Sequence, residues 1–133
     1  MKIREAMAND VLCVDRELPI PRLDELLTEE EISGAPVTDE RGNLVGIVSQ
    51  TDIVRALTTS DVRSELLGTL EQVTVSQIMT PSVLAVSPED DVAAVARTMI
   101  EARVHRVPVT EKDKLVGIIT TFDLLRVLAA PAK

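Results

Sequence analysis

Aromatic side chains are almost missing from this sequence of 133 residues. It contains no tryptophan, no tyrosine and one phenylalanine, Phe122. Proteins that hold single-stranded nucleic acid stack its bases on aromatic rings, so the composition argues against that class of site. The core must be built from aliphatic residues and methionine, and a flat ligand would have to lie between aliphatic side chains.

Histidine and cysteine occur once each, as His105 and Cys13. One cysteine excludes an internal disulfide, and one residue of each kind argues against a metal site. No nucleophile motif accompanies His105, so the sequence does not predict an enzyme. Cys13 lies in a short apolar run, which predicts a small side chain buried in a strand.

Long apolar runs and basic residues are also scarce. No segment approaches the roughly 18 apolar residues of a membrane span, and the charged N-terminus is not followed by the apolar stretch of a signal peptide. Acidic residues outnumber lysine and arginine by 22 to 14, and the resulting charge of −8 argues against nucleic acid as a partner. These features predict a globular protein of the cytoplasm with no membrane contact.

What the sequence does contain is one pattern written twice. Met7 and Met79 close similar segments 72 positions apart, and the Ala-Pro-Val of residues 35–37 returns as Val-Pro-Val 72 positions later. The Gly-containing segment of residues 44–48 returns after only 71 positions. One residue is therefore lost in the polar turn between the two segments, where a deletion is tolerated.

Each copy predicts the order strand, helix, strand, strand, helix. The apolar runs 11–14 and 83–86 predict buried strands, and the closing helices are expected at about 50–57 and 121–128. Apolar residues at helical spacing predict the first helix of each copy; they are Leu23, Leu26 and Leu27, then Val92, Val95, Ala96 and Met99. The predicted domains are residues 1–58 and 75–133, and the linker 59–74 is expected to be partly helical.

A βαββα unit of this size cannot cover both faces of its sheet alone. We therefore expect an α/β (α+β) fold in which two such units pack sheet to sheet with pseudo-two-fold symmetry. That arrangement would create two equivalent clefts where the copies meet.

In both copies a hydroxyl residue follows the Gly-containing strand, and an aspartate comes three positions later. The pairs are Ser49 with Asp52 and Thr120 with Asp123. At a helix start the free backbone N–H groups favour a phosphate, and a carboxylate one turn later can accept both hydroxyls of a ribose. The same spacing also fits a capping box, a routine helix start that is compatible with ligand binding.

Two other charged features of the sequence have simpler interpretations. Arg55 and Arg126 each follow the aspartate by three residues, which predicts an ion pair on the helix face, with ligand or partner contact as the alternative. The acidic run of residues 29–31 predicts a solvated helix end.

The Pro-Val strand followed by Gly-x-x-x-Ser/Thr-x-x-Asp, present twice in register, resembles the CBS domain in the tandem arrangement called a Bateman module. The resemblance covers residue 3 to about residue 128. It implies a regulatory module that senses an adenosine-containing ligand such as AMP, ADP, ATP, S-adenosylmethionine or NAD, with no covalent cofactor. It also implies a homodimer and an unidentified protein regulated in trans. The alternative is a ligand-free scaffold for dimerisation or partner docking.

The resemblance implies two nucleotide sites of unequal character. In the first copy the site residues are Asp52 for the ribose, Ser49 for phosphate or ribose, and Gly34, Ala35, Pro36 and Val11 beside the base. In the second copy the counterparts are Asp123, Thr120, Arg106, Val107, Pro108 and Val83, with His105 next to them. The basic cluster of Arg103, His105 and Arg106 occurs only in the second copy. If one site is used, we expect it to be the second.

Overall fold

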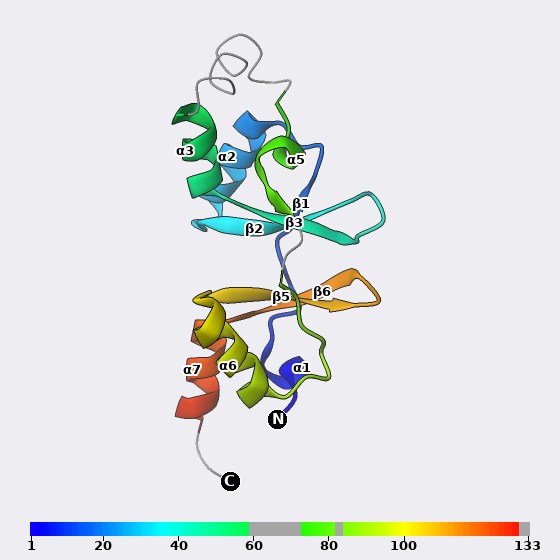
Figure 1. Ribbon diagram of the computed structural model, residues 1–133, viewed down its shortest axis with the longest axis vertical. Coiled ribbons are helices and arrows are strands. Elements are labelled where there is room, and N and C mark those ends of the chain that lie inside the picture. The colour runs from blue at the N-terminus through cyan, green and yellow to red at the C-terminus, as the bar shows by residue number, and fades with distance from the viewer. Residues whose placement is uncertain (59–72, 82–83, 131–133) are drawn as a thin grey trace. The chain divides into compact units, whose positions relative to one another are not determined.

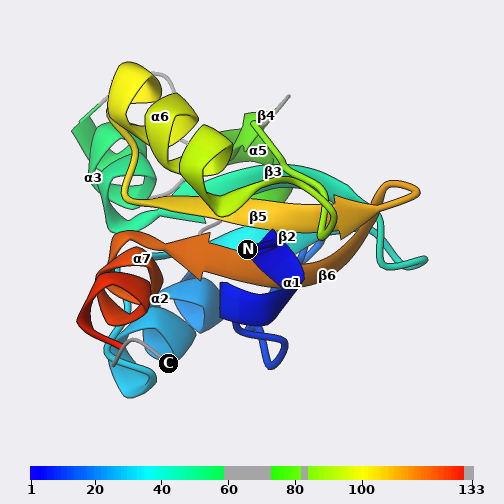
Figure 2. The ribbon, with the colours of Figure 1, turned by 90° about the horizontal axis from the view of Figure 1, so that it is seen from below.

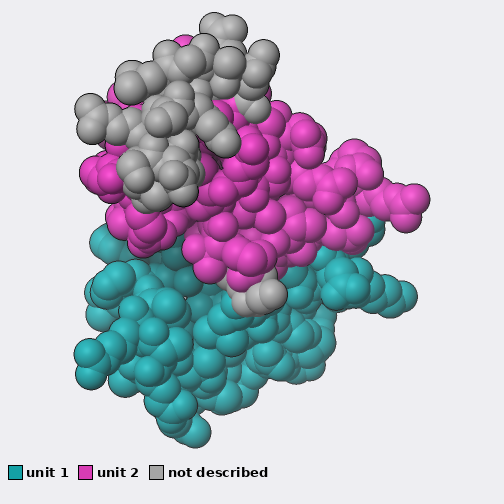
Figure 3. All heavy atoms as spheres, turned by 45° about the horizontal axis from the view of Figure 1, so that its top comes forward, with its two compact units in different colours: residues 1–11, 84–133 teal, residues 12–83 magenta. Residues whose placement is uncertain are grey.

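A computed structural model describes residues 1–58, 73–81 and 84–130 of the chain. The chain forms two compact units (Figure 3): unit 1 comprises residues 1–11 and 84–133, and unit 2 comprises residues 12–83. Each unit has its own sheet, with its helices on one face of that sheet (Figure 1). The predicted mixed α+β fold is therefore confirmed.

Unit 2 contains a four-stranded sheet in the order β1-β2-β3-β4. β1 pairs parallel with β2, whereas β2 with β3 and β3 with β4 pair antiparallel. Its elements are β1 (Val14–Asp15), α2 (Ile20–Glu29), β2 (Gly34–Thr38), β3 (Leu44–Ser49), α3 (Gln50–Thr58), α5 (Val75–Ile78) and β4 (Thr80–Pro81).

Unit 1 is built on the antiparallel hairpin of β5 and β6 (Figure 2). Single bridges flank it: Val86 pairs parallel with Val109, and Ala8 pairs antiparallel with Ile118. These bridges occupy the repeat positions of β1 and β4, so the strand order of unit 2 recurs with shorter outer strands. The elements are α1 (Ile3–Ala6), α6 (Val92–Ala102), β5 (Arg106–Glu111), β6 (Lys114–Thr120) and α7 (Thr121–Ala129).

Each unit has an aliphatic core, as the shortage of aromatic residues predicts. Leu23 and Leu27 of α2 are fully buried in unit 2, and Val95 and Met99 occupy the same repeat positions in unit 1. Phe122 is 66% exposed and takes no part in either core. Proline in the first turn of α2 fits there because the missing N–H has no partner within the helix.

The first segment of each sequence repeat packs in the unit formed mainly by the other repeat. Ile3 is fully buried in unit 1, and its backbone N donates to the carbonyl of Asp90 at 2.8 Å. Val75, at the same repeat position, is fully buried in unit 2 and donates to the carbonyl of Leu18 at 2.9 Å. The ranges 1–58 and 75–133 thus describe the repeat, while the compact units exchange these segments.

The residue lost between the copies lies in the hairpin turn. In unit 1 the turn between β5 and β6 is two residues, Lys112 and Asp113, both with positive φ (52° and 70°). The longer turn of unit 2 is held by Asp39, whose Oδ1 accepts the backbone N–H of Arg41 and of Asn43, each at 2.9 Å. Two different closed turns therefore connect equivalent strands.

Two predictions about the first strands are wrong. Of the run 11–14 only Val14 lies in a strand, and Cys13 is exposed rather than buried. The reason is that an edge strand needs few paired residues, so only the inward side chain of Val14 enters the core. In the second copy Val86 makes a single bridge, while Val83 and most of the predicted linker helix lie outside the described residues.

Candidate functional site

The predicted hydroxyl–aspartate motif of the first copy lies where β3 passes into α3. Asp52 Oδ2 accepts the backbone N–H of Ser49 at 2.8 Å and its hydroxyl at 3.1 Å. In return, Ser49 Oγ accepts the backbone N–H of Asp52 at 3.3 Å. The other carboxylate oxygen, Oδ1, accepts Nη1 of Arg55 at 3.0 Å. The two side chains therefore form a reciprocal cap, and the predicted ion pair lies beside it.

The junction between β6 and α7 repeats this arrangement in the second copy. Asp123 Oδ2 accepts the backbone N–H and the hydroxyl of Thr120, both at 2.9 Å, and Thr120 Oγ1 accepts the backbone N–H of Asp123 at 3.1 Å. Arg126 Nη1 donates to Asp123 Oδ1 at 3.0 Å, and its guanidinium lies 5.1 Å from the ring centroid of Phe122. The same geometry has thus formed twice from different hydroxyl residues.

Hydrogen bonds within the protein use most of the acceptor positions of both carboxylates. The Asp52 and Asp123 side chains are only 6% and 5% exposed. An ionised carboxylate accepts about four hydrogen bonds, and the cap and the arginine occupy three of them. A ribose hydroxyl could use the remaining acceptor position. A second position becomes available if the arginine, Arg55 or Arg126, moves aside; each is 66% exposed. Both roles named from the sequence therefore remain chemically compatible.

The backbone N–H groups predicted to meet a phosphate are partly used within the protein. The N–H of Gln50 donates to the carbonyl of Ser33 at 2.8 Å, and that of Thr121 donates to the carbonyl of His105 at 2.8 Å. Because the hydroxyl of each cap accepts a further N–H, each helix start offers an anion fewer donors than the sequence suggested.

The strand register brings one further predicted residue to each motif. Gly34 lies opposite Ser49 in unit 2, and Arg106 lies opposite Thr120 in unit 1. A Cβ atom on Gly34 would lie 2.9 Å from the carbonyl oxygen of Val48, so this position has no room for a side chain. At equivalent positions the second junction therefore has an arginine and the first a glycine.

The remaining predicted site residues lie in different surroundings. Four strand residues are buried, so only their backbone atoms are suited to meet a ligand; they are Ala35, Pro36, Val107 and Pro108. Val11 is half-buried and belongs to unit 1, whereas Ser49 and Asp52 belong to unit 2. Val11 thus lies at the boundary between the units, one residue before unit 2 begins at Leu12.

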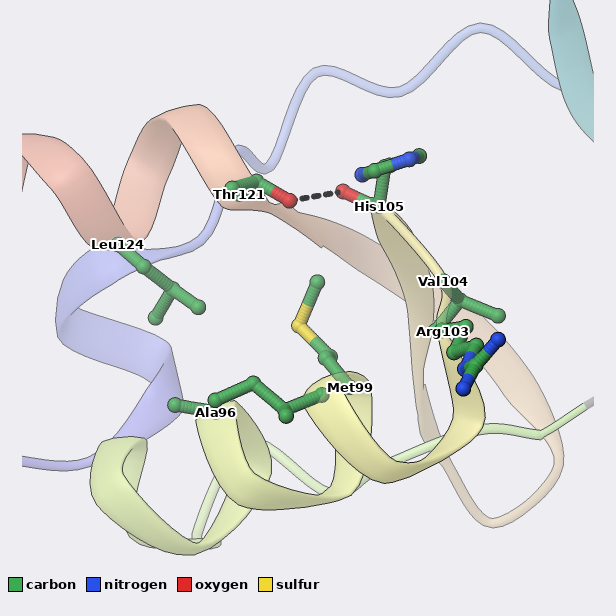
Figure 4. A pocket seen from close by; sticks show the side chains of 8 residues that line it. Ala96, Met99, Arg103, Val104, His105, Thr121 and Leu124 are labelled. Carbon is green, nitrogen blue, oxygen red and sulfur yellow. Dashed lines mark hydrogen bonds between the residues drawn. The ribbon is translucent and has the colours of Figure 1, made fainter.

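His105 uses its backbone rather than its ring at the second junction. Its carbonyl accepts the hydroxyl of Thr121 at 3.1 Å as well as the backbone N–H of that residue. The exposed imidazole points away from Met99 (Figure 4). His105 thus holds the first residue of α7 next to β5, a structural role that the sequence did not reveal.

Two grooves that the sequence did not indicate lie between helices. In unit 1 a cavity of about 370 Å³ lies between α6 and α7, where Ala96, Met99 and Leu124 converge (Figure 4). In unit 2 a cavity of about 650 Å³ lies between α2 and α3. One sequence feature could have indicated such grooves: apolar residues on the helices at positions that do not face the core, such as Ile100, which is 75% exposed.

Within the described ranges, no group of three or more His, Cys, Asp and Glu residues is placed to hold a metal ion. In the same ranges no helix combines the length and apolar character needed to cross a membrane.

Comparison with known proteins identifies the class to which this repeated architecture belongs. A family model for the CBS domain matches residues 3–59 and residues 75–130. The chain therefore belongs to the CBS-domain family. The two matches make it a tandem CBS pair, as the repeated motif predicted.

Among curated proteins, CBSX2, a chloroplastic CBS domain-containing protein of Arabidopsis thaliana, is 32% identical over 124 residues, which cover 77% of this chain and 52% of that protein. MJ1225 of Methanocaldococcus jannaschii is 27% identical over 128 residues, covering 96% of this chain and 43% of that protein. The chain thus spans about half, or less, of the length of these relatives.

Solved structures share the fold over nearly the whole chain. The crystal structure of CBSX2 in complex with AMP has a TM-score of 0.82 at 27% identity and covers 96% of each chain. The CBS pair of MJ0100 in complex with 5′-methylthioadenosine and S-adenosyl-L-methionine has a TM-score of 0.78 at 25% identity, covering 97% of this chain and 96% of that one.

Replacing the aspartate of either cap should destabilise the protein. We expect Asp52→Ala and Asp123→Ala each to lower the free energy of unfolding by about 1–2 kcal/mol, because a cap is lost and the partly buried N–H and hydroxyl of residue 49 or 120 lose their acceptor. Chemical denaturation measures the change. Glu40→Ala, which removes an exposed carboxylate from an ion pair between side chains 41% and 71% exposed, is the control and should change stability little. Equal effects of the control and the cap variants would contradict the capping role.

Proposed function

We propose that this chain is a regulatory module that binds an adenosine-containing nucleotide at its strand–helix junctions and catalyses no reaction. The observation that carries the proposal is the hydroxyl, aspartate and arginine arrangement found at both junctions. A diol-accepting carboxylate beside a helix start suits a ribose phosphate. The AMP complex of CBSX2 and the S-adenosyl-L-methionine complex of MJ0100 support this ligand class.

The second junction is the better candidate for a phosphorylated ligand. Arg106 lies opposite Thr120 on the neighbouring strand, whereas Gly34 occupies that position in the first junction. A guanidinium forms bidentate, charge-assisted hydrogen bonds with phosphate oxygens, which backbone N–H groups alone do not match. The first junction would then suit a ligand part with less negative charge.

The proposal includes a homodimer that acts on a protein partner in the cytoplasm. Apolar side chains on α6 and α7 are exposed, with Ile100 at 75% and Leu128 at 82%. A patch of such residues is typical of a protein–protein interface. Ligand binding can change the output only if the two conformational or oligomeric states bind the ligand with different affinity.

The second candidate is a scaffold that binds no nucleotide. It is favoured by one observation: the carboxylates of Asp52 and Asp123 are already occupied by the cap and by arginine. In that case the repeated motif serves only to begin α3 and α7.

Calorimetric titration separates the two candidates. We expect AMP, ADP, ATP, S-adenosylmethionine or NADH to bind with a measurable heat, and Asp123→Asn to weaken that binding by about 10-fold or more through loss of a charge-assisted hydrogen bond. The matched variant is Asp52→Asn, which makes the same change at the other junction. Absence of binding by all five ligands to the folded wild-type protein would leave the scaffold as the function.

A further inference from the structure

The ion pair between Arg126 and Asp123 leaves a ligand one acceptor position on that carboxylate. Oδ2 of Asp123 accepts the backbone N–H and the hydroxyl of Thr120, both at 2.9 Å. Oδ1 accepts Nη1 of Arg126 at 3.0 Å. Since each carboxylate oxygen offers about two acceptor positions, Oδ2 is filled and Oδ1 keeps one. A bound sugar must therefore share Oδ1 with the guanidinium.

A ribose brings two hydroxyl donors to this one position. Its 2′ and 3′ hydroxyls are on neighbouring carbons, so either of them can donate to Oδ1 of Asp123. The other hydroxyl then has no acceptor on this carboxylate. Removing one of the two hydroxyls from the sugar therefore costs little affinity, because the remaining hydroxyl uses the same position.

The arginine is the partner of Asp123 that can be removed without opening the cap. The Asp123 side chain is 5% exposed, whereas that of Arg126 is 66% exposed. Thr120 also accepts the backbone N–H of Asp123 at 3.1 Å, so it is tied to the start of α7 in both directions. A change at position 126 therefore frees a second acceptor position on Oδ1 and leaves Oδ2 as it is.

The single phenylalanine of the sequence holds the same guanidinium. Arg126 lies 5.1 Å from the ring centroid of Phe122, within the range of a cation–π contact. The equivalent residue of the first copy is Thr51, 71 positions earlier, which has no ring. The second junction thus fixes its arginine through a contact that position 51 cannot make.

We propose that Arg126 sets the sugar selectivity of the second junction. It keeps its place on Oδ1 of Asp123 when a nucleotide binds, so ribose and deoxyribose nucleotides bind with similar affinity. Phe122 acts through Arg126 as a positioning residue. This selectivity depends on the nucleotide binding proposed above and specifies which part of the ligand the junction does not distinguish.

Four monophosphates that differ only in the sugar test the role of Arg126 by calorimetry. We expect the wild type to bind AMP, 2′-deoxy-AMP and 3′-deoxy-AMP within about 3-fold of one another. It should bind 2′,3′-dideoxy-AMP about 10-fold more weakly, because no hydroxyl is left for Oδ1. In Arg126→Met both hydroxyls find an acceptor, so each singly deoxygenated nucleotide should bind about 10-fold more weakly than AMP. All four ligands carry the same charge, so the lost attraction between arginine and phosphate cancels in these ratios.

Three further variants separate this role from a general effect on the fold. Arg126→Lys returns a cation to Oδ1 and should restore the wild-type ratios. Phe122→Leu keeps the ion pair but loosens the guanidinium, so it should raise the preference for AMP over 2′-deoxy-AMP about 2- to 3-fold. Arg97→Met removes an exposed cation of α6, away from the junction, and should leave every ratio as in the wild type. Circular dichroism melts show whether each variant is folded.

The outcomes distinguish the role of Arg126 from nucleotide binding itself. A wild type that prefers AMP to both singly deoxygenated nucleotides by 10-fold would show that the arginine gives way to the ribose, which overturns the proposal. Unchanged ratios in folded Arg126→Met would overturn it as well, and in both cases nucleotide binding would stand. If none of the four ligands binds to the folded wild type, nucleotide binding and the selectivity are both overturned.

Discussion

Ile3→Ala is expected to destabilise unit 1 by about 2–5 kcal/mol, although residue 3 lies more than 80 positions before most of that unit. Ile3 is fully buried with Val107, Val109 and Ile119, so truncation leaves a cavity in that core. Hydrogen exchange followed by mass spectrometry should show faster exchange in α6, β5 and β6 and little change in β2 and β3.

The repeat provides a matched control at the equivalent position. Val75→Ala should destabilise unit 2 by about 2 kcal/mol, and its faster exchange should appear in residues 12–58. The reciprocal pattern follows from the exchanged segments, since Ile3 donates to Asp90 and Val75 donates to Leu18. If Ile3→Ala instead accelerated exchange in residues 12–58, the division into these two units would be wrong.

Arg106→Ala is expected to weaken the binding of AMP or ATP by about 10- to 100-fold, as the loss of hydrogen bonds to a charged group predicts. Arg106 is the cation that the strand register places opposite Thr120. The effect should be larger for ATP than for AMP, because more phosphate charge is left without a partner. Calorimetry with both nucleotides measures the two losses.

The control for this variant removes an equal charge from the same hairpin. Lys112→Asn lies in the turn at the other end of β5, and asparagine tolerates its φ of 52°. We expect this variant to bind both nucleotides as the wild type does. An equal loss in both variants would indicate a general effect of net charge, and no loss in Arg106→Ala would show that this residue does not meet the phosphates.

The two closing helices illustrate what local sequence decides. The predicted ranges 50–57 and 121–128 each differ from α3 and α7 by one residue at the C-terminal end. The accuracy follows from the hydroxyl and aspartate, which cap a helix through contacts only three residues apart. The function of the same residues was harder to predict, because capping and ribose binding require the same side chains.

The edge strands illustrate where local reasoning fails. The apolar run 11–14 has the composition of a buried strand, yet Cys13 is exposed and only Val14 enters the sheet. The number of residues that pair at an edge depends on the neighbouring strand β2, which begins 20 residues further along. No pattern within the run itself contains that information.

From the amino-acid sequence alone, this protein is one βαββα pattern repeated, with aliphatic cores, capped helices and a basic cluster in one copy only. These properties follow from periodicity, composition and contacts between near neighbours. The folded structure adds that Ile3 and Val75 pack in the unit of the other repeat, that Arg106 pairs with Thr120 where Gly34 pairs with Ser49, and that a groove lies between the helices of each unit. Strand pairing and core packing join residues far apart in the chain, so these features depend on the folded arrangement.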